Sequence, residues 1–407
     1  MYFVFQTHNI DILAGTVGYI PFSTKTGSGI MISSLIDRND FPVLEQHCYL
    51  NQASLGLIGR PAVQAMHQFI DDYARHGNCY MSDSEEVGYL NTLRALGAKV
   101  FACAPSEVAI VGCASEILAQ LPIMIQRPRD SSILVVDSDF PAVTRPWLRQ
   151  QGLNRGQIRF VEDRQSENLT DALIDAIDRN TAVVAVSSVQ FATGTTVDVK
   201  RISKAVSEVD GHLIVDVTQE AGARRIDIGA WNADAVVCSG YKWLGGHGGV
   251  ALAAMSLRLL EHVPPLTGWM GAPDPFDFDA RSLPLANDAR RYTQSTMSYA
   301  SIACLTTAIQ QLLLVDERSI ESHADKLANM LVEQAGKHGW IPFRLLTDSA
   351  ACSHIVALCH PDRSAEETRK DLADRKIVCS ARGGRVRVSI APYNNENDID
   401  MLAQVLR

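Results

Sequence analysis

Beyond about residue 100, the chain alternates short apolar runs with segments in which apolar residues recur at helical spacing. The runs are nearly continuous and rich in Val, Ile and Ala, which is typical of strands buried on both faces of a sheet. We therefore expect an α/β fold with a mostly parallel central sheet of about seven strands and helices on both faces. The predicted strands are VAIVG at 108–112, SILVVD at 132–137, IRFVE at 158–162, AVVAVSSV at 182–189, HLIVD at 212–216, AVVCS at 235–239 and GVALAAM at 249–255.

Two helices are expected before these strands. Pro61 opens the first and Gly77 is its predicted stop, and the second covers roughly 86–103. The residues expected to share one face of the first helix are Val63, Met66, Ile70 and Tyr73.

The last third of the chain predicts a smaller C-terminal α+β domain. A long helical stretch, about 301–339, leads into strands at FRLL, SHIVALC, KIVCSA and RVRVSI, with helices at 365–375 and at 395–406, the latter capped by Asn395. The expected division is an N-terminal arm at 1–37, a segment associated with the small domain at 38–60, a large domain at 61–300, and a connecting helix with the small domain at 301–407.

Composition narrows the class of partner. The 37 Lys and Arg against 46 Asp and Glu give a net charge of −9, so no whole-chain attraction to nucleic acid or to an anionic membrane is expected. Nine cysteines without paired CxxC spacing indicate reduced thiols in a cytoplasmic protein and predict no metal site. We expect a small-molecule substrate.

The first 35 residues have neither the pattern of a signal peptide nor that of a membrane span. We expect an arm, with natural translation starting at Met31 and residues 1–30 poorly packed.

The stretch from Asp216 to Gly249 carries the most specific chemistry. Asp216 ends one predicted strand, and Lys242 follows the next one, between Tyr241 and Trp243. On adjacent parallel strands, such a carboxylate and lysine would meet at one edge of the sheet, where ligands of open α/β sheets bind. This pair suits pyridoxal phosphate, which needs a lysine for its Schiff base and a carboxylate to keep its pyridine nitrogen protonated.

Eight ordered blocks extend this pattern: YLNQASLG, GCASE, DSDFPAV, SSVQFATG, DVTQ, SGYKWLGG, TQSTMSYAS and RVRVSIAPYNNENDID. Their order and spacing resemble the class V aminotransferase family of fold-type I pyridoxal-phosphate enzymes, a group with cysteine desulfurases, kynureninases, isopenicillin N epimerase-like proteins and carbon–sulfur lyases. The resemblance covers nearly everything after residue 40. It implies a homodimer with active sites at the interface.

By this resemblance, Lys242 forms the Schiff base and acts as the catalytic base, and Asp216 binds the pyridine nitrogen. A solvated surface lysine and a capping or turn aspartate are the alternatives. Phe140 would stack on the cofactor ring, or be an ordinary core residue. Gln190 and Gln219 would bind the cofactor's phenolic oxygen, or be surface amides.

The phosphate is expected at a helix N-terminus formed by Ala114 and Ser115, although Ser115 could instead be a plain helix cap. Cys113 departs from the Gly-Ala-Thr-type sequence of many relatives. Further phosphate ligands implied by the resemblance are Ser239, Tyr241 and, toward the site of a partner subunit, Thr296.

Arg387 is the candidate for gripping a substrate α-carboxylate with two parallel hydrogen bonds. Arg382 and Arg385 are nearby alternatives, and strand alternation places Arg385 and Arg387 on the same face. Asn51 and His247 are expected either to line the pocket or to be loop residues without a catalytic role.

Cysteine desulfurases that resemble this chain carry a mobile-loop cysteine in an RxGxHC-like setting, which IVCSARGGRVRVS lacks, and Cys379 is expected in the core. The favoured reaction is a carbon–sulfur β-elimination on a cysteine S-conjugate, in which Lys242 removes the Cα proton. The alternatives are an aminotransferase, a decarboxylating or epimerising class V enzyme, or a catalytically silent scaffold. The loop at 264–284, with Trp269, Met270 and Phe276, is expected to form a lid, a dimer contact or simple packing.

Overall fold

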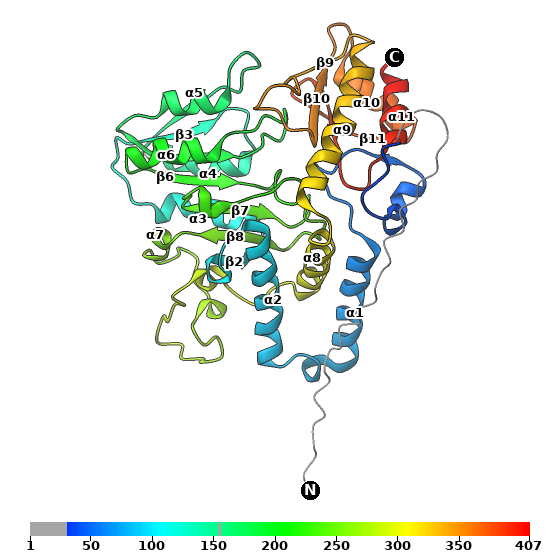
Figure 1. The fold of residues 1–407 in the computed structure, drawn as a ribbon. Helices are drawn as coiled ribbons and strands as arrows, with labels where there is room; N and C mark the ends of the chain where they lie inside the picture. The colour runs from blue at the N-terminus through cyan, green and yellow to red at the C-terminus, as the bar shows by residue number, and fades with distance from the viewer. Residues whose placement is uncertain (1–30, 154–155) are drawn as a thin grey trace. The chain divides into compact units, whose positions relative to one another are not determined.

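The computed structural model describes residues 31–153 and 156–407 (Figure 1). The predicted arm lies almost entirely outside the described residues, as does the expectation of poor packing for residues 1–30. Residues 32–407 form one compact unit, so the boundaries proposed within them stay predictions.

All seven predicted strands are confirmed in one sheet, in the order β2-β8-β7-β6-β5-β3-β4. Only β8 among them runs antiparallel to its neighbours, and the remaining pairs are parallel. The strands are β2 (Val108–Val111), β3 (Ser132–Val136), β4 (Gln157–Val161), β5 (Thr181–Ser187), β6 (His212–Asp216), β7 (Ala235–Ser239) and β8 (Ala251–Met255).

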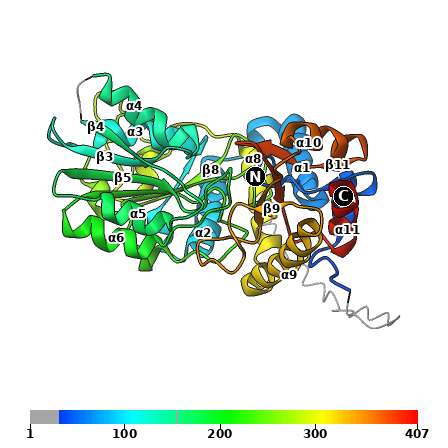
Figure 2. The same cartoon turned by 90° about the horizontal axis from the view of Figure 1, so that it is seen from above.

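Helices cover both faces of this sheet. The helices α3 (Ala114–Met124) and α4 (Pro141–Gln151) pack on one face, and α2 (Asp83–Phe101), α5 (Leu169–Ala176) and α6 (Val199–Glu208) pack on the other (Figure 2). Successive strand residues therefore enter different cores: Ile133 and Val135 face α3 and α4, and Leu134 and Val136 face the opposite layer. Burial on both faces explains why the strands read as continuous apolar runs.

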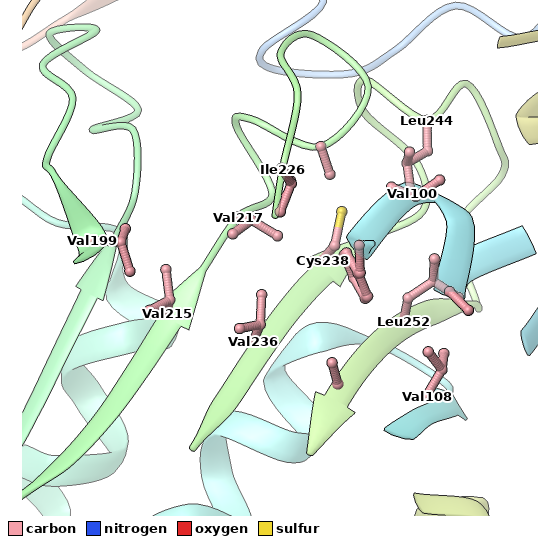
Figure 3. Close-up of a cluster of buried hydrophobic side chains, with 14 of the residues drawn as sticks. Val100, Val108, Val199, Val215, Val217, Ile226, Val236, Cys238, Leu244 and Leu252 are labelled. Atoms are coloured by element: carbon pink, nitrogen blue, oxygen red, sulfur yellow. The ribbon is translucent and has the colours of Figure 1, made fainter. Parts of the chain in front are cut away.

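The core on the α2 side draws side chains from neighbouring strands (Figure 3). Val215 of β6, Val236 and Cys238 of β7, and Leu252 of β8 all belong to it. This packing and the pairing of β6 with β7 position the carboxyl ends of both strands, where Asp216 ends β6 and Lys242 follows β7.

The helix α1 (Arg60–His76) begins with a proline in its first turn and ends at Gly77, as predicted. The predicted apolar face is wrong in part: Met66 packs against a core cluster, whereas Ile70 and Tyr73 are 49% and 52% exposed. Ala62 and Phe69 are buried instead, since α1 packs against α8 (Tyr299–Leu312) with the neighbouring face.

The predicted single helix at 301–339 is two helices. The second, α9 (Glu317–Gly336), is bent by 80° from α8, and Asp316 caps it by accepting a hydrogen bond from Ser319 N at 2.9 Å. No single helix in the described ranges is long and apolar enough to cross a membrane, although α8 and α9 pass such a test as a bent pair.

The C-terminal part contains an antiparallel sheet ordered β12-β13-β10-β9 and a parallel pair of β1 with β11. The predicted strand FRLL is wrong: the strand ends before Phe343, and the Arg344 side chain turns inward to pair with Asp163 at 2.9 Å. The elements are β1 (Cys48–Tyr49), β9 (Ile341–Pro342), β10 (Ile355–Cys359), α10 (Ala365–Asp374), β11 (Ile377–Val378), β12 (Ser380–Arg382), β13 (Arg385–Ser389) and α11 (Glu396–Leu406).

The expected strand KIVCSA is divided at Cys379 between β11 and β12. The pairing of β1 with β11 links the segment at 38–60 to this part of the chain, as predicted. The shorter helical segments are α7 (Leu257–Leu260) and 3-10 turns at Arg38–Asp40, Pro42–Glu45, Gly77–Cys79, Pro105–Glu107, Ile228–Ala230, Trp269–Gly271 and Ala289–Tyr292.

Candidate active site

The carboxyl ends of β5, β6 and β7 border a cavity that is partly open to solvent. Asp216 is the last residue of β6, and Lys242 follows the parallel neighbour β7, as the sequence predicted. The lining residues are Cys113, Ala114, Ser115, Phe140, Ala142, Ser187, Phe191, Asp216, Thr218, Gln219, Ser239, Tyr241 and Lys242.

Asp216 is a buried carboxylate with few polar neighbours. Its Oδ1 accepts a hydrogen bond from Thr218 N at 2.8 Å. Burial raises the pKa of the carboxyl group, while hydrogen bonds from Thr218 and the charge of Lys242 act against that shift. The bond from Thr218 N has the i to i+2 pattern of an Asx turn, and a cationic ring nitrogen at this position would in addition stabilise the ionised carboxylate.

Lys242 is 6% exposed, which excludes a solvated surface lysine. Burial lowers the pKa of its ammonium group to about 8, against the opposing effect of Asp216. Its Nζ lies 5.2 Å from the ring centroid of Phe140. The backbone is held as well, because Lys242 O accepts a hydrogen bond from Gln52 Nε2 at 2.9 Å. Lys242 is therefore a positioned amine that loses its proton more easily than an exposed lysine.

Phe140 is not a core residue. It is the N-cap of α4, lines the cavity and is 38% exposed. Its ring meets that of Phe191 edge to face, with 5.4 Å between centroids. A ring in this position can stack on a flat aromatic ligand.

Asp139 is a buried residue that the sequence analysis missed. Its carboxylate accepts hydrogen bonds from Phe140 N at 2.6 Å, Ser187 N at 2.7 Å and Ser187 Oγ at 2.5 Å. Burial raises the pKa of Asp139 to about 6, although these hydrogen bonds oppose the shift. The carboxylate thus links the backbone of Phe140 to the end of β5, where Ser187 is the register partner of Asp216. The signal in the sequence was an acidic residue shortly after the buried strand β3, which ends at Val136.

The N-terminus of α3 faces the cavity through Ala114 and Ser115. The N-cap is Cys113, which makes no side-chain capping bond, so Ser115 is not the helix cap. Amides of a first helical turn have no partner within the helix, and they favour an anion together with the helix dipole. Ser239 and Tyr241 lie in the same lining, and burial raises the pKa of Tyr241 while a hydrogen bond with Ser239 opposes the shift.

The two glutamines differ in how their amides are used, and neither is on the surface. Gln219 Oε1 accepts a bond from Trp243 Nε1 at 2.9 Å, and its Nε2 donates to Ala53 O at 3.0 Å. Gln190 donates to Ser187 O at 3.2 Å, and its Oε1 is buried without a partner. Gln219 lines the cavity, Gln190 does not, and their binding of a phenolic oxygen stays a prediction.

Arg387 is buried on β13 and is not itself part of the cavity lining, but it contacts the lining residue Phe191. Its guanidinium donates to Phe191 O at 2.7 Å and to Ser54 Oγ at 2.5 Å, and its Nε has no partner. Arg385, on the same strand face, stacks instead on Phe343 at 4.3 Å from the ring centroid. Tertiary contacts thus separate the two arginines that strand alternation could not distinguish.

The remaining candidates lie outside the cavity lining. Asn51 forms a bridge to Ser389, and its buried Oδ1 lacks a partner. His247 is exposed and contacts Gly248 O through its ring, and Thr296 is exposed as well. Arg382 is exposed at the end of β12. Their roles in binding stay predictions.

These groups fit pyridoxal phosphate. A helix N-terminus suits the phosphate, Phe140 the ring face, Asp216 the ring nitrogen and Lys242 the aldehyde carbon. Among the described residues Asp216 forms no ion pair, so its buried carboxylate has room for a pyridinium nitrogen as partner. When bound, this cofactor supplies an electron sink for charge that develops at the substrate's Cα.

Comparison with known proteins identifies the family of the chain. The sequence model of the aminotransferase class-V family matches residues 48–402. An uncharacterised aminotransferase of Bacillus subtilis is 24% identical, over 89% of this chain and 94% of its own length. A kynureninase of Bacillus anthracis is also 24% identical, over 91% of this chain and 90% of its own.

Solved structures share the fold. A cysteine desulfurase from Thermococcus onnurineus superposes with a TM-score of 0.81 at 19% identity, covering 90% of this chain and 96% of that one. A cystine C–S lyase in complex with its product, cysteine persulfide, gives 0.80 at 18% identity, covering 90% and 99%. The family match over most of the chain confirms what the eight blocks predicted: the chain belongs to the aminotransferase class-V family of enzymes, whose cofactor is pyridoxal phosphate.

Proposed function

We propose that this enzyme is a carbon–sulfur β-lyase that acts on a cysteine S-conjugate. Lys242 removes the Cα proton, and Arg387 holds the α-carboxylate. Asp216 maintains the charge of the ring nitrogen, and Phe140 covers one face of the ring. Pyruvate, ammonia and a thiol are the products.

The observation that carries this proposal is the tight turn between β12 and β13. Arg382 and Arg385 are register partners, so only Gly383 and Gly384 connect the strands. Both glycines have positive φ, 55° and 75°, as a two-residue hairpin turn requires. The desulfurases that this chain resembles carry their reactive cysteine in a mobile loop between the last strands, and this connection has neither the length nor the cysteine.

Cys379 does not replace that cysteine. It is 7% exposed, and burial raises the pKa of its thiol to about 12. Because the thiolate is the nucleophilic form, a thiol in this state does not accept sulfur from a substrate at neutral pH. In β-elimination the Cβ–S bond of the substrate breaks and the sulfur leaves as a thiol that keeps its substituent. No cysteine of the protein is needed.

The test is to incubate the cofactor-loaded enzyme with S-methyl- and S-ethyl-L-cysteine without any keto acid. We expect a thiol and pyruvate to form in equal amounts, and no product from a Lys242→Ala variant. An aminotransferase would instead need a keto acid acceptor and would release no thiol. Absence of thiol from every cysteine conjugate tested rejects the proposal.

The proposal includes a cytoplasmic homodimer in which Thr296 reaches the phosphate of the partner's cofactor. Its exposed position outside the cavity lining of its own chain supports that role. The exposed Ile70 and Tyr73 of α1, and Trp269, whose ring centroid lies 5.8 Å from that of Phe276, are candidate dimer contacts. A mass of one chain by light scattering would contradict the dimer.

A further inference from the structure

The hairpin of β12 and β13 presents three arginines on one face of the small sheet. Ser380 pairs with Arg387 and Arg382 pairs with Arg385, so these four side chains share a face. Arg387 is buried against Phe191 and Ser54, at the edge of the cavity. Arg382 is its diagonal neighbour across the pair, a relation that places the two residues about 7–8 Å apart.

Two of the three guanidinium groups have a partner that accounts for their position. Arg387 donates to Phe191 O and Ser54 Oγ, and Arg385 lies over Phe343 at 4.3 Å. The described contacts of Arg382 comprise one hydrogen bond, to the carbonyl oxygen of the adjacent Ala381 at 2.8 Å. Within the described ranges no carboxylate forms an ion pair with it.

Arg382 also belongs to the electrostatic environment of the reacting amine. Its charge, like that of Arg387, disfavours the ammonium form of Lys242 and lowers the pKa of that lysine, after the larger effect of burial. The charge of Arg382 also lowers the pKa of Arg387, after the larger effect of burial. Two cations are thus close enough to Lys242 for their charges to act on it, whereas one α-carboxylate neutralises only one of them.

We propose that Arg382 is a specificity-determining residue that binds a second anionic group on the substrate side chain. The substrate class is then a cysteine S-conjugate with a distal carboxylate, such as an S-(carboxyalkyl)cysteine, whose α-carboxylate lies on Arg387. This inference rests on the proposed function for the sulfur atom, but the preference for a second anion does not depend on cleavage.

Binding is therefore measured with two amino acids that have no leaving group on Cβ. L-2-Aminoadipate and L-norleucine have side chains of equal length, and only the first ends in a carboxylate. Calorimetric titration of the cofactor-loaded enzyme is expected to show at least about tenfold tighter binding of L-2-aminoadipate, the ratio that one charge-assisted contact of about 1.4 kcal/mol gives. Arg382→Gln should reduce this ratio to within about twofold and leave the affinity for norleucine unchanged.

The matched control is Arg385→Gln, which removes the same charge from the same hairpin. It should retain the preference for L-2-aminoadipate, because the guanidinium of Arg385 stacks on Phe343. Equal binding of the two amino acids to the unaltered enzyme overturns the inference. So does an Arg382→Gln variant that binds both about equally less well, since Arg382 would then hold the α-carboxylate.

The cleavage assay separates this inference from the proposed function. S-(2-Carboxyethyl)-L-cysteine and S-propyl-L-cysteine are compared in the same way, and the acidic conjugate should have the lower KM at similar kcat. A binding preference without thiol release from either conjugate supports Arg382 and rejects the lyase. Thiol release from both conjugates with equal KM supports the lyase and rejects the role of Arg382.

Discussion

Gly56 is the residue through which the N-terminal segment sets the position of Lys242. Its N–H donates to Tyr241 O at 3.0 Å, and a Cβ built on Gly56 would lie 2.0 Å from Lys242 O. Real Cβ contacts are essentially never under 3.0 Å, so Gly56→Ala must separate the two backbones by at least 3.0 − 2.0 = 1.0 Å. Lys242 O also accepts a hydrogen bond from Gln52, so a separation at Gly56 disturbs two contacts that position the backbone of the lysine.

A misplacement of about 1 Å at a reacting group can cost about a hundredfold in rate, or about 2.7 kcal/mol of activation free energy. We expect Gly56→Ala to lower kcat for thiol release by about that factor. Overpacking should also reduce the free energy of unfolding by about 1–3 kcal/mol. The assay is kcat under saturating substrate, with bound cofactor measured by visible absorbance and stability by urea denaturation.

Gly88→Ala is the matched control, since no atom lies within 4 Å of the added Cβ. In the helix α2 this change should leave kcat unaltered and stabilise the protein by up to about 1 kcal/mol. A Gly56→Ala enzyme that keeps kcat within about threefold of the unaltered one would refute the reasoning, because a rate loss of about a hundredfold follows from the displacement.

Three further predictions address charge and the reaction class. The pKa of Lys242 is lowered to about 8, and only the neutral amine reacts with the aldehyde. Uptake of pyridoxal phosphate by cofactor-free protein should therefore accelerate as pH rises toward 8 and level off above it. Stopped-flow absorbance measures this rate, and a pH-independent rate would contradict the prediction. Cys379→Ser should retain thiol release within about twofold, since a buried thiol with a pKa of about 12 has no catalytic role, whereas abolished activity would restore the desulfurase interpretation. Arg344→Met should lower the free energy of unfolding by about 3–5 kcal/mol, because it leaves Asp163 buried and unpaired. Arg159→Met in an exposed pair should cost less than about 1 kcal/mol in the same urea titration, and equal costs would show that burial of the pair is irrelevant.

Much of the central sheet could be predicted from the sequence, because strands buried on both faces leave a local signature of continuous apolar residues. The same locality made the pairing of Asp216 and Lys242 predictable: each lies at the end of an apolar run, and parallel neighbours bring such ends together. Local patterns failed where packing overrode them. The helix predicted at 301–339 breaks at Asp316, and the FRLL strand gives way to the inward turn of Arg344.

The amino-acid sequence by itself determined the family and the cofactor, because both are carried by short blocks whose order and spacing can be read directly along the chain. The roles that these blocks assign to single residues stay predictions. Only the tertiary structure decided which side chains share the site across long separations. It placed Arg387 beside Phe191 and Ser54, and turned Arg385 to Phe343. It also joined Asp139 to Ser187 beneath the cavity. The physical reason is that such contacts depend on how helices and strands pack together, and the order of residues within any one element does not encode that packing.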